Sequence, residues 1–213
     1  LERYGCDSTV IAYGVDPRPE PPGETLRKLG LEPRRYFLYV SRFEPENNPH
    51  RVAEAYRKVR GETPLVMVGG APYATRFIRS FTARADPRIR FPGPIYGPGY
   101  RELLSHALAY IQATEVGGTH PALVEAMGYG NCLVVNDTPE NREVAGDAAL
   151  YFKAELPAAL SSTLQRLLRH PERFAHLPAK AADRARRLYS WDRMIDRYVA
   201  LFRSLIESGS REP

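Results

Sequence analysis

The chain is 213 residues long, which suits one large domain or one domain with an appended helical tail. Its 43% hydrophobic content supports a buried core, and no apolar stretch approaches the ~20 residues that cross a bilayer. The lone Cys6 and Cys132 exclude a disulfide framework and a zinc site of paired cysteines, so we expect a reducing compartment.

The formal net charge of +5 comes from arginine, since among the 30 basic residues the only lysines are Lys28, Lys58, Lys153 and Lys180. Arginine recognises phosphate well, but these arginines are scattered and form no dense run. A GC-rich genome would produce the same excess, and we favour that explanation. No signal-peptide pattern is seen at the start of the chain, and we expect a cytoplasmic protein, with peripheral contact to the inner face of the cell membrane left open.

The first 25 residues are expected to form a linker and not a domain. Residues 9–13 are a candidate strand, and turn-rich and proline-rich stretches follow up to Gly23. The last residues, 208–213, are expected to be disordered.

From Tyr36 onward, strands and helices alternate. Apolar runs predict strands at 36–40, 64–68, 108–112, 132–136 and 148–152, and a further short strand is predicted at 88–91. Helical spacing predicts helices at 49–60, 73–85, 100–107, 121–129 and 138–144, then three helical segments from 155 to 206. This alternation predicts an α/β fold, a Rossmann-like three-layer α/β/α sandwich over residues 26–188 with a parallel sheet and a C-terminal helical tail.

Ligands of such sheets bind at the carboxyl ends of the strands, and three loops of this chain are expected to meet there. The first contains Arg42 and Asn48, the second is Gly69-Gly70, and the third runs from Glu115 to Glu125. Arg42 is placed to clamp a diphosphate, with a surface pair to Glu44 or Glu46 as the equal alternative. Asn48 either binds phosphate or hydroxyl groups or turns the chain, and the glycine pair is weak evidence because glycine is common after strands.

The third loop carries the strongest signal in the chain. Gly117-Gly118-Thr119 lets backbone N–H groups approach a ligand, and a helix beginning near Pro121 adds partial positive charge. These features favour the phosphates of a nucleotide, and carboxylates at Glu115 and Glu125 suit sugar hydroxyls. His120 suits a phosphate contact or proton transfer, although a lone loop histidine is more often polar filling. The plain alternative for Glu125 is charge complementarity with its helix.

Several signals are missing. No Gly-x4-Gly-Lys-Ser/Thr loop, no Gly-x-Gly-x-x-Gly fingerprint after a strand and no Gly-x-Ser-x-Gly elbow occurs. No Asp-x-Asp pair or His/Cys cluster offers a metal site, so we expect no metal and no cofactor beyond the substrate.

The chain resembles the C-terminal, donor-binding half of a GT-B glycosyltransferase of the large retaining group usually numbered family four. The resemblance covers about residues 10–203, and its most specific motif is Glu125–Asn131, similar to the family's Glu-Ala-Met-Ala-x-Gly-x. The other matching segments are Ile11–Asp16, similar to the interdomain linker Ile-Pro-x-Gly-Val-Asp, Tyr39–Phe43, similar to Val-Gly-Arg-Leu, and Val66–Gly70, similar to Val-Ile-Val-Gly-x-Gly.

The chain also departs from that family. Asn48-Pro49 stands where the family usually has Lys-Gly, so a diphosphate-binding lysine is lost. Nine residues separate Glu115 from Glu125 where seven are usual, which leaves the register around Glu115 uncertain by two residues. The motif Val-Gly-Gly-Thr-His-Pro resembles the corresponding sequence in a bacterial subgroup of the family that builds surface polysaccharides.

The resemblance implies roles for these residues. Arg42 would contact the donor diphosphate, Glu125 the nucleotide ribose and Glu115 the transferred sugar. The loop of Gly117, Gly118 and Thr119 would line the phosphates, and the backbone near Ile95 would read the base.

The resemblance implies a nucleotide-sugar donor, metal-independent transfer with retention to a glycan or lipid-linked acceptor, and no activity without the missing N-terminal acceptor domain. Residues 189–207 would form a helix that crosses back toward that domain, with an apolar side exposed here; packing on its own domain is the equal alternative. Two rivals stay open: a GT-B-like nucleotide-sugar epimerase, and a basic nucleic-acid-binding module suggested by the pI near 9.3. The second lacks a basic, aromatic-interleaved stripe, so no nucleic-acid partner is expected.

Overall fold

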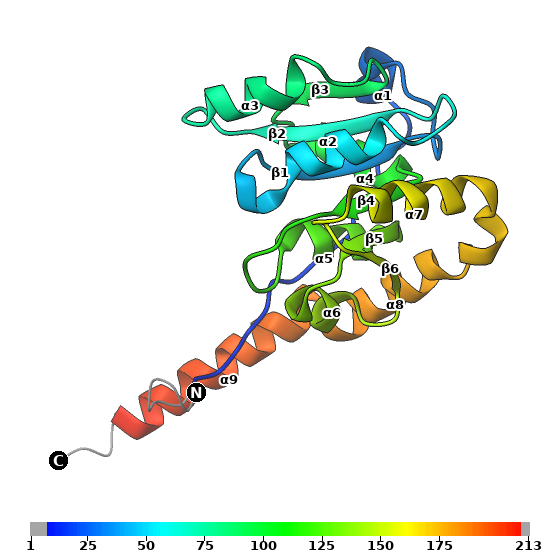
Figure 1. Cartoon of the computed structure of the whole chain (residues 1–213). Helices are drawn as coiled ribbons and strands as arrows, with labels where there is room; N and C mark the ends of the chain where they lie inside the picture. The colour runs from blue at the N-terminus through cyan, green and yellow to red at the C-terminus, as the bar shows by residue number, and fades with distance from the viewer. Residues whose placement is uncertain (1–7, 210–213) are drawn as a thin grey trace.

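The computed structural model describes residues 8–209, and within them a parallel sheet carries helices on both faces (Figure 1). The strands are β1 (Phe37–Arg42), β2 (Leu65–Gly70), β3 (Ile89–Gly93), β4 (Ala109–Gln112), β5 (Cys132–Asn136) and β6 (Ala149–Phe152). The helices are α1 (Glu24–Leu29), α2 (Pro49–Tyr56), α3 (Thr75–Thr82), α4 (Gly97–His106), α5 (Pro121–Gly128), α6 (Pro139–Ala145), α7 (Pro157–Arg169), α8 (Leu177–Leu188) and α9 (Trp191–Gly209). The predicted fold class is confirmed.

The strand order is β3-β2-β1-β4-β5-β6, and every neighbouring pair is parallel. Strand β1 lies in the middle and pairs with β2 on one side and β4 on the other. The chain therefore builds one half of the sheet outward from β1 and then returns to build the other half. The switch point between the two halves lies between β1 and β4.

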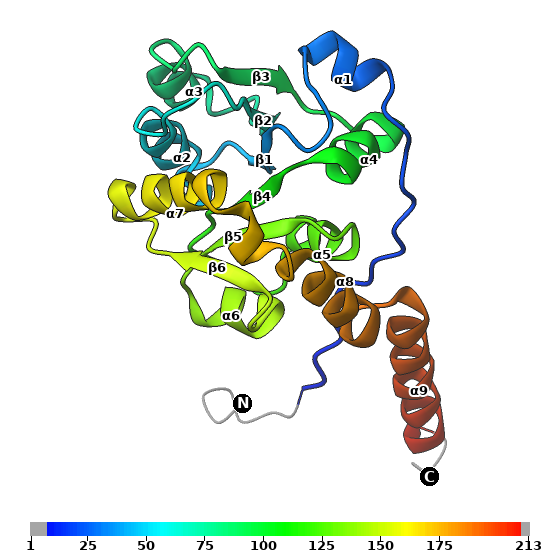
Figure 2. The same cartoon turned by 90° about the vertical axis from the view of Figure 1, so that its right-hand side faces the viewer.

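Two apolar clusters fill the space between the sheet and its helices, because successive strand residues point to opposite faces. Leu38 and Tyr110 belong to the cluster that includes residues of α1, α4, α5 and α8, whereas Phe37 and Ile111 belong to the cluster with α2 and α7. Figure 2 shows α2, α3 and α7 on one side of the sheet and α1, α4 and α5 on the other. The burial of both faces explains the continuous apolar runs of the strands.

The strand predicted at residues 9–13 is wrong. Residues 8–14 form no strand, and the nearest pairing is an isolated bridge between Val15 and Ser190. The segment runs beside the start of α9 and away from the sheet (Figure 1). Gly14 packs so closely there that a Cβ would lie 2.6 Å from Trp191 Cδ2. An apolar run without an adjacent strand has no ladder to join.

Helix α1 was not predicted from the sequence, and it begins on a carboxylate from far along the chain. Glu102 of α4 is buried and accepts hydrogen bonds from the backbone N–H groups of Gly23 (2.7 Å), Leu26 (3.0 Å) and Thr25 (3.1 Å). Burial raises the pKa of Glu102, but the hydrogen bonds from these N–H groups outweigh it and hold the pKa below its ordinary value. The carboxylate of Glu102 in α4 therefore caps the amino end of α1, a different helix of the same chain.

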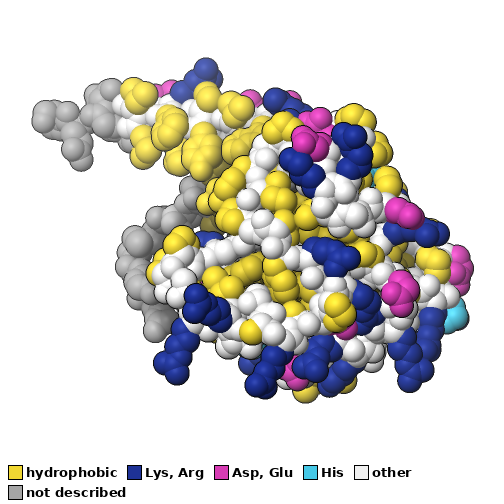
Figure 3. All heavy atoms as spheres, turned by 90° about the horizontal axis from the view of Figure 1, so that it is seen from above, with side chains coloured by type: hydrophobic (Ala, Val, Ile, Leu, Met, Phe, Trp, Pro, Cys, Tyr) yellow, Lys and Arg dark blue, Asp and Glu magenta, His cyan; other side chains and the backbone are white. Residues whose placement is uncertain are grey.

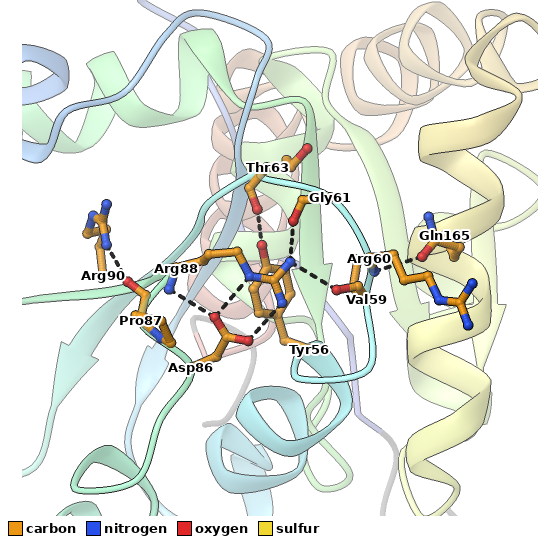
Figure 4. Close-up of polar contacts among 10 residues, drawn as sticks. All are labelled: Tyr56, Val59, Arg60, Gly61, Thr63, Asp86, Pro87, Arg88, Arg90 and Gln165. Carbon is orange, nitrogen blue, oxygen red and sulfur yellow. Dashed lines mark hydrogen bonds and ion pairs between the residues drawn. The ribbon is translucent and has the colours of Figure 1, made fainter.

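At the amino ends of the strands, Arg88 stabilises the fold through several polar contacts (Figure 4). Arg88 Nη2 lies 2.7 Å from Asp86 Oδ2, and Arg88 Nη1 donates to the carbonyl of Val59 at 2.9 Å. The same guanidinium donates to Gly61 O and lies 4.9 Å from the centroid of the Tyr56 ring. These contacts connect the loop after α2 to the start of β3. At least one of the many arginines therefore has a structural role.

Helix α9 extends away from the sheet, and Figure 3 shows hydrophobic side chains along it. Met194 is buried, but the side chains that follow on this face are 39–56% exposed; they are Ile195, Tyr198, Val199 and Phe202. Of the two alternatives for this helix, the exposed apolar face is the one found. We expected residues 208–213 to be disordered, but α9 continues through Gly209. The rest of that segment, residues 210–213, lies outside the described residues. None of the described helices is long and apolar enough to cross a membrane.

Candidate donor-binding site

The two halves of the sheet meet in a direct contact at the switch point. Asn48 follows β1 and Glu115 follows β4, and Asn48 Nδ2 donates to Glu115 Oε1 at 2.9 Å. The backbone N–H of Glu115 also donates to the carbonyl of Glu46 at 3.0 Å. In open α/β sheets the crevice at the switch point is where ligands bind. These contacts therefore place the candidate site between the loop after β1 and the loop after β4.

Asn48 is held in a conformation that few other residues adopt. Its φ of 58° and ψ of 33° lie in the left-handed region, and its side chain is 1% exposed. Asn48 Nδ2 also donates to the carbonyl of Ala113 at 2.9 Å. Both N–H groups of the amide are thus engaged inside the protein, and they act on a ligand only through Glu115.

Arg51 also contacts Glu115, and the sequence prediction missed it. Its Nη1 lies 3.1 Å from Glu115 Oε1, with side chains 35% and 40% exposed for Arg51 and Glu115. Arg51 stands in the first turn of α2, three residues after Asn48. That spacing was available as a signal, because residues three apart at a helix start share one side of the helix.

The loops after β1 and β2 lie at the same edge of the sheet, on the left in Figure 1. Gly69 has a φ of 143°, and a Cβ there would lie 1.8 Å from the carbonyl oxygen of Ser41, so only glycine fits beside β1. Gly70 follows it at the end of β2 and pairs with Arg42. The Arg42 side chain is 74% exposed, and its Nη1 lies 3.4 Å from Glu44 Oε1. This pair is the surface alternative that the sequence left open, at a position still facing the site edge.

The loop before α5 contains Gly117, Gly118 and Thr119. Gly117 has a φ of 121°, and a Cβ there would lie 3.0 Å from the His120 ring, so residues other than glycine are disfavoured at this position. His120 is the N-cap residue of α5, but its side chain makes no capping hydrogen bond. Burial lowers the pKa of His120 and Glu140 opposes that shift, so the ring is neutral near pH 7. The positive end of α5 thus has no side-chain cap.

Glu125 lies one turn into α5 and has a partner that the sequence did not reveal. The phenol of Tyr100 in α4 donates to Glu125 Oε2 at 2.6 Å. Both side chains border a cleft of ≈ 330 Å³, whose other lining residues include Asp16, Gly97, Pro121 and Trp191. Two helices that are separate in sequence therefore bring a carboxylate and its donor to one cleft.

Ile95 follows β3 in the turn that the resemblance assigned to base recognition. Its side chain is half-buried and packs against the apolar cluster, and a Cβ on Gly99 would lie 3.2 Å from Ile95 Cγ2. The side chain therefore packs against the edge of this cluster. The base contact implied by the resemblance is a backbone contact.

A larger hollow, of ≈ 650 Å³, lies at the opposite end of the sheet and includes Arg34, Glu62 and Leu108. We do not assign the site there, because ligands of parallel sheets bind at the carboxyl ends of the strands. Among residues 8–209 no group of three or more His, Cys, Asp or Glu side chains is arranged to hold a metal ion.

The side chains predicted from the sequence thus fall into three groups of contacts. Asn48 and Glu115 are in contact, and Arg51 joins them. Glu125 stands with Tyr100, and Arg42 with Glu44. Gly69 and Gly117 allow close backbone packing, and Ile95 is half-buried against the apolar cluster.

Comparisons with known proteins identify the family and the fold. Residues 24–187 match the family described as glycosyl transferases group 1. Comparison with curated sequences gives no match.

Solved structures share the fold at low identity. HepE of Anabaena, crystallised with UDP and glucose, has 13% identity and a TM-score of 0.77, with 84% of this chain and 51% of that chain covered. Sucrose-phosphate synthase of Thermosynechococcus elongatus has 18% identity and a TM-score of 0.79, with coverage of 93% and 52%. A glycosyltransferase of Rickettsia africae has 13% identity and a TM-score of 0.78, with coverage of 93% and 57%.

This chain spans about half the length of these structures. The family match covers most of the chain, and solved structures share its fold. The chain therefore belongs to the group 1 glycosyltransferase family.

Proposed function

We propose that this domain binds a nucleoside-diphosphate sugar at the carboxyl edge of its sheet. The observation that carries the proposal is the Asn48–Glu115–Arg51 contact at the switch point, beside a glycine loop and an uncapped helix start. HepE, which has the same fold, was crystallised with UDP and with UDP-glucose. Uridine diphosphate is accordingly the first nucleotide to test.

Each part of the donor has a proposed counterpart. Backbone N–H groups of Gly117, Gly118 and Thr119 and the start of α5 receive the diphosphate, with Arg42 on the opposite side. Glu125 accepts hydrogen bonds from the ribose hydroxyls. Glu115 faces the transferred sugar and orients its hydroxyls, His120 contacts the sugar or the phosphate as a neutral donor, and the backbone at Ile95 reads the base. Gly69 and Gly70 keep the site open between the first two loops.

The proposed reaction is transfer of the sugar with retention at its anomeric carbon, without a metal. The departing diphosphate gains negative charge in the transition state, and preorganised N–H groups and guanidinium groups stabilise that charge. Glu115 is an orienting group and not a nucleophile. Its Oε1 is occupied by Asn48 and Arg51, so Oε2 is the oxygen available to a sugar.

The acceptor, a glycan or lipid-linked molecule, is proposed to bind to another domain of a longer protein. The exposed apolar face of α9, which includes Ile195, Tyr198 and Phe202, is the surface that we assign to that domain. On this proposal the present chain catalyses no transfer alone. Sustained sugar transfer by the 213-residue polypeptide would refute this part of the proposal.

The donor site is tested by calorimetric titration of the domain with UDP, dTDP, GDP and ADP, repeated on Glu125→Ala. We expect one diphosphate to bind selectively, and the variant to lose about 100-fold in affinity because two hydrogen bonds to a charged acceptor are removed. Thermal unfolding of both proteins controls for misfolding. Steeply salt-dependent binding to DNA or RNA in place of diphosphate binding would favour a nucleic-acid module.

A further inference from the structure

Tyr100 stands where it controls the carboxylate that the proposed function assigns to the ribose. Its phenol donates to Glu125 Oε2 at 2.6 Å, a short distance typical of a hydrogen bond to an ionised acceptor. Tyr100 comes from α4 and Glu125 from α5, so the contact joins two elements across the cleft of ≈ 330 Å³. Among the described hydrogen bonds, the side chain of Glu125 takes part only in this one.

A glutamate on a helix has three side-chain torsions, and a free one must be ordered when it binds a ligand. The bond from Tyr100 orders Glu125 before any ligand arrives. It also occupies Oε2 and leaves Oε1 as the oxygen without a described protein donor. Burial and the neighbouring Tyr110 and Glu125 raise the pKa of Tyr100, so the phenol stays a donor throughout the physiological range.

Tyr100 is itself fixed by the helix that carries it. The next two residues of α4 are both anchored to the segment that precedes α1. Arg101 Nε donates to Glu20 Oε1 at 2.8 Å, and Glu102 caps α1. These contacts hold α4 in place, so the phenol reaches Glu125 from a rigid base.

We propose that Tyr100 is the positioning residue of the ribose site and determines how strongly the domain selects a ribonucleotide over one without ribose hydroxyls. The proposal rests on the proposed function, because it takes Glu125 as the group that binds the diol. Tyr100 acts through Glu125 and does not touch the ligand. Its removal therefore weakens only the part of the affinity that comes from the ribose hydroxyls.

The test compares UDP with 2′,3′-dideoxy-UDP, or the equivalent pair if another of the four diphosphates is selected. Calorimetry gives the ratio of the two dissociation constants for the wild type, Tyr100→Phe and Glu125→Ala. In Tyr100→Phe we expect UDP affinity to fall about fivefold, the effect of one net hydrogen bond, with dideoxy-UDP affinity unchanged. In the Glu125→Ala background the same substitution should have no further effect.

Tyr129→Phe is the matched control, because its phenol donates to the carbonyl of Arg18 at 3.1 Å and not to Glu125. It should leave the ratio as in the wild type. Equal weakening of both nucleotides in Tyr100→Phe, or no change in either, would overturn the proposal. If Glu125→Ala loses UDP binding while Tyr100→Phe keeps the wild-type ratio, the proposed function stands and this inference fails. If the wild type binds no diphosphate, both fail.

Discussion

Two regions of this molecule use carboxylates in opposite ways. At the junction of α4 and α1, Glu102 accepts backbone N–H groups on both oxygens, from Gly23 and Leu26 on Oε1 and from Thr25 on Oε2. At the sheet edge, the described side-chain hydrogen bonds of Glu115 all end on Oε1 and that of Glu125 ends on Oε2. Glu102 therefore has both oxygens satisfied by the protein. Glu115 and Glu125 are each oriented through one oxygen, and the other oxygen is an acceptor for a ligand.

The comparison predicts that Glu102 matters for stability and not for binding. Replacement by Gln exchanges a charged acceptor for an amide that satisfies fewer of the three N–H groups, so Glu102→Gln should cost about 2–3 kcal/mol of unfolding free energy. Urea denaturation measures the loss, and UDP affinity should stay within about twofold. A binding defect without a stability defect would contradict the assignment.

The same carboxylate predicts a pH dependence. The pKa of Glu102 in the folded state is held below its ordinary value of 4.5, so the unfolded state binds the proton more readily. Its contribution is complete above pH 4.5 and is lost as the pH falls through the folded-state pKa. Glu102→Gln should therefore be less stable than the wild type at pH 6, with the difference shrinking below pH 4.5.

Asn48 has two roles that substitutions can separate: its amide holds Glu115, and its backbone adopts a left-handed conformation. Asn48→Ala loses the amide and must adopt a φ of 58°, whereas Asn48→Gly loses only the amide. We expect Asn48→Ala to cost about 2 kcal/mol and Asn48→Gly about 1 kcal/mol less, measured by urea denaturation. Equal losses in the two variants would show that the left-handed backbone carries no cost.

Substitution of Glu115 should weaken binding of the sugar part of the donor and leave binding of the nucleotide unchanged. Glu115→Gln removes the charge that accepts sugar hydroxyls, so affinity for UDP-glucose should fall about tenfold while affinity for UDP stays within about twofold. Titration with both ligands gives the two numbers. Equal weakening of both would place the contact of Glu115 on the nucleotide and not on the sugar.

The smallest effect is expected for Arg51. Its pair with Glu115 is more than one-third exposed on both sides, so screening limits its contribution to less than about 1 kcal/mol. Arg51→Met should lose that stability at low salt and match the wild type near 0.5 M NaCl. Among the ion pairs of residues 8–209, none involves Glu125, so Tyr100→Phe should show no such salt dependence. A persistent loss for Arg51→Met at high salt would indicate lost packing in place of a lost ion pair.

The site was only partly predictable. Glu115 and Glu125 were found because they bracket a glycine loop between a strand and a helix, a local pattern. Tyr100 was not found, because its contact with Glu125 depends on the angle between α4 and α5 and leaves no spacing rule. Arg42 was predicted with two equal alternatives, and its pair with Glu44 depends on the course of an exposed loop.

The sequence by itself determined the strands, the parallel sheet and the loops that meet at its carboxyl edge. Side-chain periodicity and glycine positions are local, and burial of both sheet faces makes the apolar runs continuous. Only the tertiary structure decided that residues 9–13 are no strand, that α1 exists and that Glu115 and Glu125 have their partners. The cap on α1 and both partner contacts join residues 25 to 79 positions apart, and such contacts, like strand pairing, form only when helices and strands are packed together.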